Sequence, residues 1–344
     1  MNVLILHDRI SPDSREDERD ALVQAEAVGH ALSELGHTSQ TLPFSLNLAE
    51  AAHAIQAYAP DLVFNLVESV EGHGRLIYLA PALLDALGVA YTGARTGAML
   101  LTSSKLLTKK WLRANGVPTP DWIAPRGDRA VSDSPDETAD PAVASLPFTP
   151  GRYIVKSVWE DASVGLSAAS VVNVGSESAL MAEISQRRNE LGGEAFAEAY
   201  IDGREFNLSV LEGSGGSRVL PPAEIRFVDF PADRPRIVDY EAKWDASSFA
   251  YTHTQRCFDF CASDSPLLSA LAELALRCWR MFDLSGYARV DFRIDVEGRP
   301  WVLELNANPC LSPDAGFAAA AERAGMTYPQ MIEHIVYAAT RTRK

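Results

Sequence analysis

The sequence contains no run of about 18 consecutive apolar residues, so no transmembrane helix is expected. The N-terminal segment has no basic stretch, and its apolar run is too short for a signal peptide. Cysteine is scarce, because the chain has only Cys257, Cys261, Cys278 and Cys310. Their irregular spacing favours free thiols in a reducing cytoplasm. Cys257 and Cys261 have no second Cys or His pair beside them, so a zinc site is not expected.

Positive charge is also scarce. The net charge of −15 argues against a general affinity for nucleic acid or for an anionic membrane. A nucleotide can still bind where a few Lys and Arg side chains converge. No G-x-G-x-x-G follows the first strand, which disfavours a dinucleotide-dependent dehydrogenase. The length of 344 residues suits two or three domains, and 47% hydrophobic residues is ordinary for a globular protein.

The first 95 residues or so alternate between expected strands and helices. The pattern predicts strands over 3–6 and 61–67 and helices over 20–35 and 76–87, with Gly36 and Gly88 after the helices. Strands that alternate with helices pair in parallel, so this part of the chain predicts an α/β layer.

The remaining chain predicts a basic helix, a loop and a series of strands and helices. The basic helix, over 103–115, carries Lys105 and ends at a Gly- and Pro-rich break. Residues 126–150 have little periodicity, which indicates a mobile surface loop or an insertion. Strands are expected over 153–156, 169–174 and 195–199, and helices over 178–188 and 328–340.

Two strand-like runs flank Glu297 and Gly298, which form a typical turn dipeptide. An even-length loop centred there would place Asp291 opposite Glu304 and would place Arg289 opposite Asn306. All four side chains would then lie on one face of the hairpin. Two opposed carboxylates repel each other unless a cation lies between them. Oxygen ligands from Asp, Glu and Asn suit magnesium bound together with substrate phosphates.

An ordinary hairpin with a solvated polar face explains the same spacing equally well. In either case, Val290, Phe292, Leu303 and Leu305 are expected on the buried face. The opposition of the two carboxylates also depends on the loop, because an odd loop without a compensating bulge would shift the register.

The hairpin resembles the metal-binding hairpin of ATP-grasp ligases, in particular that of the D-alanine–D-alanine ligase family. Four further segments match the family's motifs in the same order. They are the strand ending at Lys156, the small-residue loop 160–167, the segment 197–206 and the segment 240–244. The resemblance spans roughly residues 95–344, and extends more loosely over 1–95.

The resemblance implies an α/β ATP-grasp fold with an N-terminal Rossmann-like parallel sheet. It implies three parts, over residues 1–102, 103–197 and 198–344, of which the second is the lid and the third carries the metal site. It also implies ATP and two Mg²⁺ ions, which Mn²⁺ can replace. The implied metal ligands are Asp291, Glu304 and Asn306, and the implied catalytic residues are Arg289, Lys243 and Ser163. The implied nucleotide site consists of Lys105, Lys156, Ser163, Gly165, Glu198, Ala199, Tyr200, Ile201, Glu205 and Leu303.

These residue types suit the roles that the resemblance implies. Lys105 and Lys156 are point charges suited to phosphate oxygens, although a lone lysine is more often a solvated surface residue. Ser163 and Gly165 lie in a loop whose N–H groups can cradle phosphate. Such a loop must open for nucleotide exchange, so we expect 160–167 to be open or poorly ordered without nucleotide, with Trp159 packed at one end. Glu205 suits the ribose hydroxyls.

The part of the family pattern that binds the substrates is changed in this chain. Ala162 replaces a Ser, Trp244 replaces a Tyr, and Asp314 lies beside the Ala315–Gly316 pair that replaces a carboxylate-binding Ser. A pocket that has lost this hydroxyl is expected to bind D-alanine poorly. Polar residues after the second expected strand are candidates for binding another substrate, and an exposed polar loop explains them equally well. They are Asn65, Glu68, Glu71, His73 and Arg75.

The sequence therefore predicts a cytoplasmic ligase that activates a carboxylate as an acyl phosphate and joins it to an amine. Its expected partners are small-molecule substrates, without nucleic acid or membrane, and the resemblance suggests a homodimer. One alternative is a genuine D-alanine–D-alanine ligase with an unusual acceptor site. Another is an ATP-binding regulator without catalysis, which the retention of every expected metal ligand disfavours.

Overall fold

The computed structural model describes residues 1–125 and 148–341. The strands of these residues form three sheets, which follow one another along the chain. Most of the expected surface loop lies outside the described residues. None of the helices in the described part of the chain is long and apolar enough to cross a membrane.

The first sheet is parallel and has the strand order β2-β1-β3. Its strands are β1 (Asn2–Asp8), β2 (Thr38–Phe44) and β3 (Leu62–Asn65). Its helices are α1 (Glu16–Glu34), α2 (Leu48–Tyr58) and α3 (Leu79–Leu87), and the short helix η1 (Gly74–Leu76) precedes α3. The expected helix ends are confirmed, because Gly36 and Gly88 have φ values of 76° and 66°.

Strand β2 and helix α2 are not among the elements predicted from the sequence. The β2 segment is polar and contains Pro43, which removes a ladder donor. Because β2 is an edge strand of this sheet, the missing donor and the exposed side chains are tolerated.

The second sheet is antiparallel and has the strand order β4-β7-β5-β6. Its strands are β4 (Trp122–Ile123), β5 (Gly151–Ser157), β6 (Val171–Val174) and β7 (Ala195–Ala199). Helix α6 (Glu177–Arg187) covers one face of this sheet with Leu180 and Ile184, and η2 (Ala168–Ser170) precedes β6.

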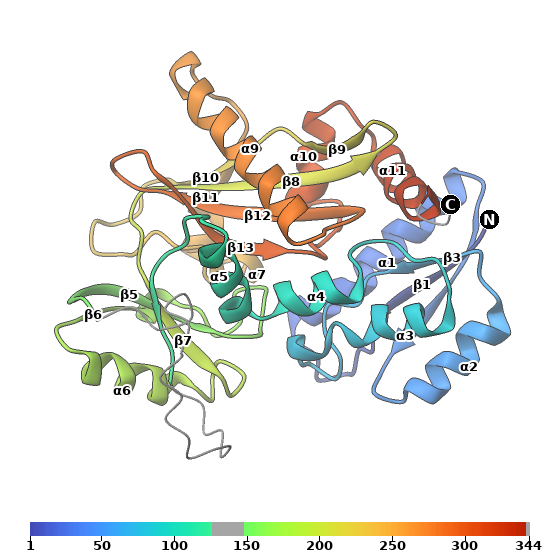
Figure 1. The fold of residues 1–344 in the computed structure, drawn as a ribbon, viewed down its shortest axis with the longest axis horizontal. Coiled ribbons are helices and arrows are strands. Elements are labelled where there is room, and N and C mark those ends of the chain that lie inside the picture. Colours follow the sequence, from blue (N-terminus) through green and yellow to red (C-terminus); the bar gives the residue numbers. More distant parts are fainter. Residues whose placement is uncertain (126–147, 342–344) are drawn as a thin grey trace.

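Helices α4 (Thr96–Ser103) and α5 (Lys105–Ala114) connect the first two sheets. The side chain of Ser104 caps α5 by accepting a hydrogen bond from the N–H of Leu107. Figure 1 shows α5 in the middle of the molecule, between the second sheet and the strands of the third.

The third sheet has the strand order β11-β10-β8-β12-β13, and β9 also pairs with β8. Its strands are β8 (Arg204–Gly213), β9 (Gly216–Val219), β10 (Ala223–Phe227), β11 (Thr254–Cys257), β12 (Tyr287–Ile294) and β13 (Pro300–Asn306). Its helices are α7 (Tyr240–Trp244), α8 (Phe249–His253), η3 (Ala262–Asp264), α9 (Ser265–Met281), α10 (Gly316–Arg323) and α11 (Tyr328–Arg341).

The last helix joins the first sheet to the third. Helix α11 contacts both α1 and β8. One buried cluster therefore contains Val3 and Leu32 from the N-terminal part together with Leu211 and Ile335. Burial of a side chain of this size stabilises the fold by about 1.5–3 kcal/mol, so this cluster fixes the two sheets relative to each other.

Gly203 lies where the chain passes from the second sheet to the third. Its φ of +143° is rare for residues with a side chain, and a Cβ here would collide with the carbonyl oxygen of Ile294. Its own carbonyl oxygen accepts a hydrogen bond from Arg293, 3.1 Å away. Only glycine fits this close approach without a backbone shift.

We predict that Gly203→Ala lowers the free energy of unfolding by about 2–4 kcal/mol, because β8 and β12 must move apart. Gly29→Ala is the matched control. It lies inside α1, where its Cβ would make only ordinary contacts of 3.6 Å or more, so stability should rise by about 0.5–1 kcal/mol. Urea denaturation measures both, and equal stability of Gly203→Ala and the parent would contradict the prediction.

Candidate active site

The hairpin of β12 and β13 brings the two expected carboxylates into opposition. Asp291 pairs with Glu304, and Arg289 pairs with Asn306, as the sequence predicted. The loop itself differs from the prediction. Ile294 pairs with Pro300, so the loop has an odd number of residues. A β-bulge in β13, opposite the step from Asp291 to Phe292, restores the predicted register.

Leu303 is the extra residue of this bulge. It is half-buried, whereas Val302 is fully buried with Val290, Phe292 and Leu305. The expectation that Leu303 lies on the buried face is therefore wrong, because the bulge shifts the alternation of side chains by one position.

Asp291 is held by three neighbouring side chains. Arg289 donates to both of its oxygens, at 2.7 and 2.8 Å. Asn306 donates to Oδ2 at 3.1 Å, and Asn207 of β8 donates to Oδ1 at 2.8 Å. Sequence reasoning missed Asn207, which comes opposite Asp291 only when β8 pairs with β12.

Lys105 joins the hairpin to the small-residue loop. Its Nζ lies 2.8 Å from Glu304 Oε1 and 2.6 Å from Asp161 Oδ1, and it also donates to the backbone oxygen of Glu160 at 2.8 Å. The ammonium group lowers the pKa of Glu304 despite its burial, and the two carboxylates raise the pKa of Lys105. The positive charge beside Glu304 is thus supplied by the chain itself.

A second pair of lysines converges on Glu198 at the end of β7. Lys109 of α5 lies 2.5 Å from one carboxylate oxygen, and Lys156 of β5 forms an ion pair with the other. The side chains of Lys109 and Glu198 are 1% and 2% exposed. The two lysines lower the pKa of Glu198 against the effect of burial. Lys109 was not among the predicted site residues, although it lies one helical turn from Lys105.

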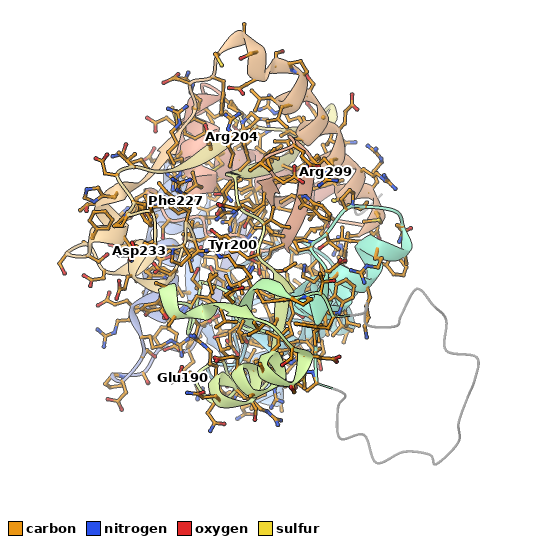
Figure 2. The ribbon with its side chains drawn as sticks, turned by 90° about the vertical axis from the view of Figure 1, so that its left-hand side faces the viewer. Glu190, Tyr200, Arg204, Phe227, Asp233 and Arg299 are labelled. Atoms are coloured by element: carbon orange, nitrogen blue, oxygen red, sulfur yellow. The ribbon has the colours of Figure 1, made fainter. Side chains whose placement is uncertain are left out.

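Among the described residues, the N–H groups of Ile201, Asp202 and Gly203, between β7 and β8, have no hydrogen-bond acceptor. The N–H of Ala199 donates to Asp121, and that of Tyr200 donates to Arg152. Figure 2 shows Tyr200 between the second sheet and the third, and its ring lies 4.3 Å from the Arg152 guanidinium.

Glu205 is buried and forms an ion pair with Arg293, with 2.8 Å between Oε2 and Nη2. These two residues face each other in the pairing of β8 with β12. Arg293 also donates to the backbone oxygens of Gly203 and Arg236, so it ties the chain after β7 to the third sheet. Sequence reasoning did not identify Arg293.

The loop 160–167 has three residues with left-handed backbone conformations. The φ values are 55° for Ala162, 61° for Ser163 and 70° for Gly165. Two of them are non-glycine residues, and such strain occurs often at ligand sites. Ser163 Oγ donates to the oxygen of Val238 at 2.7 Å, and Trp244 Nε1 donates to the oxygen of Ala162 at 3.1 Å. The loop therefore packs against the segment around α7, and its opening remains a prediction.

Lys243 lies between the loop and the hairpin. In the described part of the chain, its ammonium group has no hydrogen-bond or ion-pair partner. Burial and the nearby charge of Arg289 lower its pKa. Trp159, expected to anchor the loop, packs with Trp122, Val158 and Phe196.

The candidate substrate residues differ in burial. Glu71, His73, Arg75 and Asp314 are exposed. Asn65 is buried and accepts from the N–H of Val67, so it stabilises its own turn. Whether Asn65 also contacts a substrate stays a prediction.

Glu68 belongs to a polar network that sequence reasoning missed. It accepts a hydrogen bond from the Gln24 amide at 2.8 Å. The Gln24 amide also donates to Asp20, and its oxygen accepts from the N–H of Leu311. Asp20 also accepts from Ser312 at 2.7 Å. Burial raises the pKa of Glu68 to about 8. The network ties α1 to the loop after β13.

The described residues contain no group of three or more His, Cys, Asp or Glu side chains placed to hold a metal ion. The expected magnesium site is of another kind, because it combines two carboxylates with an amide oxygen. All four cysteines are free thiols, as predicted.

The fold and the bulged hairpin define an ATP-grasp protein with an N-terminal Rossmann-like sheet. Residues 111–337 match the family model described as the D-ala D-ala ligase C-terminus. The D-alanine–D-alanine ligase of Synechococcus sp. (strain JA-3-3Ab) is 30% identical over 338 residues, which cover 98% of this chain and 93% of that protein. An uncharacterized protein, y4sG, of Sinorhizobium fredii is 31% identical over 92% of this chain and 87% of its own length.

A solved structure of the Bacillus anthracis D-alanine–D-alanine ligase in complex with ATP has the same fold. Its TM-score is 0.70 at 21% identity, covering 100% of this chain and 98% of that one. The chain belongs to the D-alanine–D-alanine ligase family. It is accordingly a ligase that forms carbon–nitrogen bonds.

We predict that Glu198→Gln lowers the free energy of unfolding by about 3–5 kcal/mol, because it leaves the buried ammonium group of Lys109 and the half-buried one of Lys156 without their shared counter-charge. Asp202→Asn removes a carboxylate from an exposed position nearby and should change stability by less than about 0.5 kcal/mol. Chemical denaturation measures both variants. A Glu198→Gln protein as stable as the parent would contradict this role of Glu198.

A second prediction concerns pH. The pKa of Glu68 is raised from 4.5 to about 8 in the folded chain, so the folded state keeps a proton that the unfolded state releases. This contribution to stability is complete below pH 4.5 and is lost as pH rises toward 8. The stability of the parent relative to Glu68→Gln should fall by on the order of 2 kcal/mol between pH 5 and 8.

The matched control for this prediction is Glu34→Gln, which removes a carboxylate from an exposed position of α1. The stability difference between the parent and this control should be the same at both pH values. Urea denaturation at pH 5 and 8 gives both differences. A Glu68→Gln difference that does not change with pH would show that Glu68 is ionised in the folded chain.

Proposed function

We propose that the protein uses ATP to activate a carboxylate as an acyl phosphate and then joins the acyl group to an amine. The observation that carries this proposal is the opposed pair Asp291 and Glu304, each neutralised by a cation of the chain. Arg289 neutralises the first, and Lys105 links the second to the loop 160–167. Charged groups arranged in this way are suited to phosphoryl transfer, which depends on positioning and charge neutralisation.

In this proposal, ATP lies between the second and third sheets. The free N–H of Ile201 and the backbone oxygen of Ala199 would bind the adenine, with Tyr200 and Glu198 beside them and Leu303 packed against the ring. Glu205 would accept from the ribose hydroxyls. The phosphates would lie near Lys105 and Lys156, under the N–H groups of Ser163 and Gly165. The Bacillus anthracis relative was solved in complex with ATP.

Asp291, Glu304 and Asn306 are the residues that would hold magnesium. Their oxygen donors, two opposed carboxylates and one amide, fit this ion. Bound magnesium would neutralise phosphate charge.

The proposed reaction has two steps. A carboxylate oxygen of the first substrate attacks the γ-phosphorus of ATP, and the bond to the leaving ADP breaks. The amine nitrogen of the second substrate then attacks the acyl carbon, phosphate leaves and the nitrogen loses a proton. Arg289 would stabilise the oxyanion of the second step, because its guanidinium is held by Asp291 next to the site. Lys243 and Ser163 would complete the catalytic group.

The substrate half of the site differs from the family pattern at Ala162, Trp244 and Asp314. Trp244 Nε1 donates to the backbone oxygen of Ala162, so it attaches the loop 160–167 to α7. We therefore propose that D-alanine is not the preferred substrate and that Glu68 and Glu71 lie on the side of the first substrate. A genuine D-alanine–D-alanine ligase is the alternative within the family, and efficient dipeptide formation from D-alanine would establish it.

We propose the expected division into residues 1–102, 103–197 and 198–344, and the grouping of the strands into three sheets supports it. The second boundary falls inside β7, which continues to Ala199, so we place it just after that residue. We also propose a homodimer that acts on small molecules in the cytoplasm.

An assay of phosphate release tests the proposed activity. The protein is incubated with ATP, Mg²⁺ and a panel of amino acids and small carboxylic acids. At least one acid, alone or with an amine, should stimulate formation of ADP. ATP binding without any stimulated formation of ADP would favour a regulatory protein instead.

We predict that Glu304→Gln lowers turnover by at least about a hundredfold, because a magnesium ligand is lost. Folding should survive, since Lys105 keeps its ion pair with Asp161. Glu297→Gln, at the exposed tip of the same hairpin, should keep normal turnover. Rates across a magnesium titration, together with melting temperatures, give the comparison. Normal turnover of Glu304→Gln at limiting magnesium would exclude Glu304 as a ligand.

A further inference from the structure

The last residue of α6, Arg187, reaches the loop 160–167. Its Nη2 donates to the backbone oxygen of Gly165 at 3.3 Å and to Ser170 Oγ at 2.8 Å. Ser170 Oγ also accepts from the N–H of Ser167 at 3.0 Å. One guanidinium is therefore connected to two residues of the loop, once directly and once through a buried hydroxyl group.

This guanidinium has no counter-ion among the described residues. The two hydrogen bonds of Arg187 end on a backbone oxygen and a hydroxyl group, and no carboxylate of the described chain forms an ion pair with it. Its Nε is buried without a hydrogen-bond partner in the same part of the chain. The positive charge of Arg187 therefore acts on the backbone of the loop and not on an acidic side chain.

The peptide group between Gly165 and Leu166 passes this interaction into the loop. Its oxygen accepts from Arg187. Its N–H, on the opposite side of the trans peptide plane, donates to the oxygen of Ser163 at 2.9 Å. These two hydrogen bonds fix the plane of the peptide group. A peptide group that accepts from a cation is also polarised, so its N–H becomes a stronger donor.

The same arrangement continues along the loop and ends at a free donor. The peptide group that accepts at Ser163 donates through the N–H of Val164 to the oxygen of Asp161, at 3.1 Å. The peptide group that accepts at Asp161 carries the N–H of Ala162, which has no acceptor among the described residues. The peptide dipoles are thus aligned head to tail, with the guanidinium at one end and an unused donor at the other.

Two further carbonyl groups of the loop are held by side chains. Lys105 donates to the first backbone oxygen of the loop at 2.8 Å, and Trp244 donates to that of Ala162 at 3.1 Å. These contacts fix the N–H groups of Asp161 and Ser163, since the two ends of a trans peptide group point in opposite directions. Neither N–H has an acceptor in the described chain. Three successive N–H groups are therefore available to an anion.

The two lysines of the proposed phosphate site show which end of the nucleotide lies here. Lys156 pairs with Glu198, beside the proposed adenine position. Lys105 pairs with Glu304 of the hairpin and also contacts the loop. A phosphate chain that runs from Lys156 to Lys105 ends at the free N–H groups, so the anion that meets them is the terminal phosphate.

We propose that Arg187 is a positioning residue for the terminal phosphate of ATP. It holds and polarises the chain of peptide groups, so that the N–H of Ala162 and the N–H groups beside it are kept ready for that phosphate. This inference rests on the proposed ligase activity and adds to its site a residue that touches no substrate atom.

Titration calorimetry with a non-hydrolysable ATP analogue (AMP-PNP) and with ADP, each with Mg²⁺, tests this role. The two nucleotides share the adenine, the ribose and two phosphates, so the difference between them reports the terminal phosphate. Arg187→Met keeps the length of the side chain without its donors, and Arg187→Lys keeps the charge. Arg188→Met is the control, because Arg188 is exposed at the same helix end and donates to Gly193, outside the loop.

We expect Arg187→Met to weaken binding of the ATP analogue at least about tenfold, as the loss of a charge-assisted hydrogen bond does, and binding of ADP less than about twofold. Arg187→Lys should weaken binding of the analogue only about threefold, because a point charge replaces the planar donor group. Arg188→Met should bind both nucleotides as the parent does. Melting temperatures show that the variants are folded, and Arg187→Lys decides the question should Arg187→Met not fold.

Two results would overturn this role and leave nucleotide binding intact. One is a parent-like affinity for the ATP analogue in both Arg187 variants. The other is an equal loss of affinity for the analogue and for ADP, which would show that Arg187 supports the whole nucleotide site and not the terminal phosphate. A parent protein that binds neither nucleotide would instead overturn the proposed function, and the positioning role with it.

Discussion

The site depends on the placement of opposite charges around helix α5. Lys105 and Lys109 are one helical turn apart, so they project from neighbouring positions of one face. Lys109 reaches Glu198 in the second sheet, and Lys105 reaches Glu304 in the third. Breaking the buried pair of Lys109 with Glu198 costs about 3–5 kcal/mol, because the remaining charge has no counter-ion. These two contacts therefore fix the helix between the sheets and hold the carboxylates where a nucleotide would bind.

The same contacts explain how a nucleotide could change the structure. Lys105 also pairs with Asp161, so the loop 160–167 is attached to the hairpin through one ammonium group. Phosphate oxygens and magnesium would compete for this group and for Glu304. Binding would then release the loop from the hairpin and attach it to the phosphates instead. Trp244 and Ser163 hold the loop's other side against the segment around α7.

Sequence reasoning reached the architecture and the carboxylate pair but not the contacts made across strands. The pairing of Asp291 with Glu304 was predicted correctly although the loop is odd, because a bulge compensates. Nothing in the local spacing distinguishes Lys105 from the buried Lys109. Arg293 acquires its neighbours only through the order of strands in the third sheet, which no local pattern specifies. The strand β2 was missed because an exposed edge needs no hydrophobic alternation.

A crystal structure with Mg²⁺ and a non-hydrolysable ATP analogue tests the central claim most directly. The account predicts that the metal is bound by Asp291, Glu304 and Asn306 and that the adenine meets the N–H of Ile201. It also predicts that Lys105 Nζ leaves Glu304, now 2.8 Å away, for a phosphate oxygen. An analogue bound elsewhere, or bound here with the Lys105–Glu304 ion pair intact and no metal at the hairpin, would contradict it.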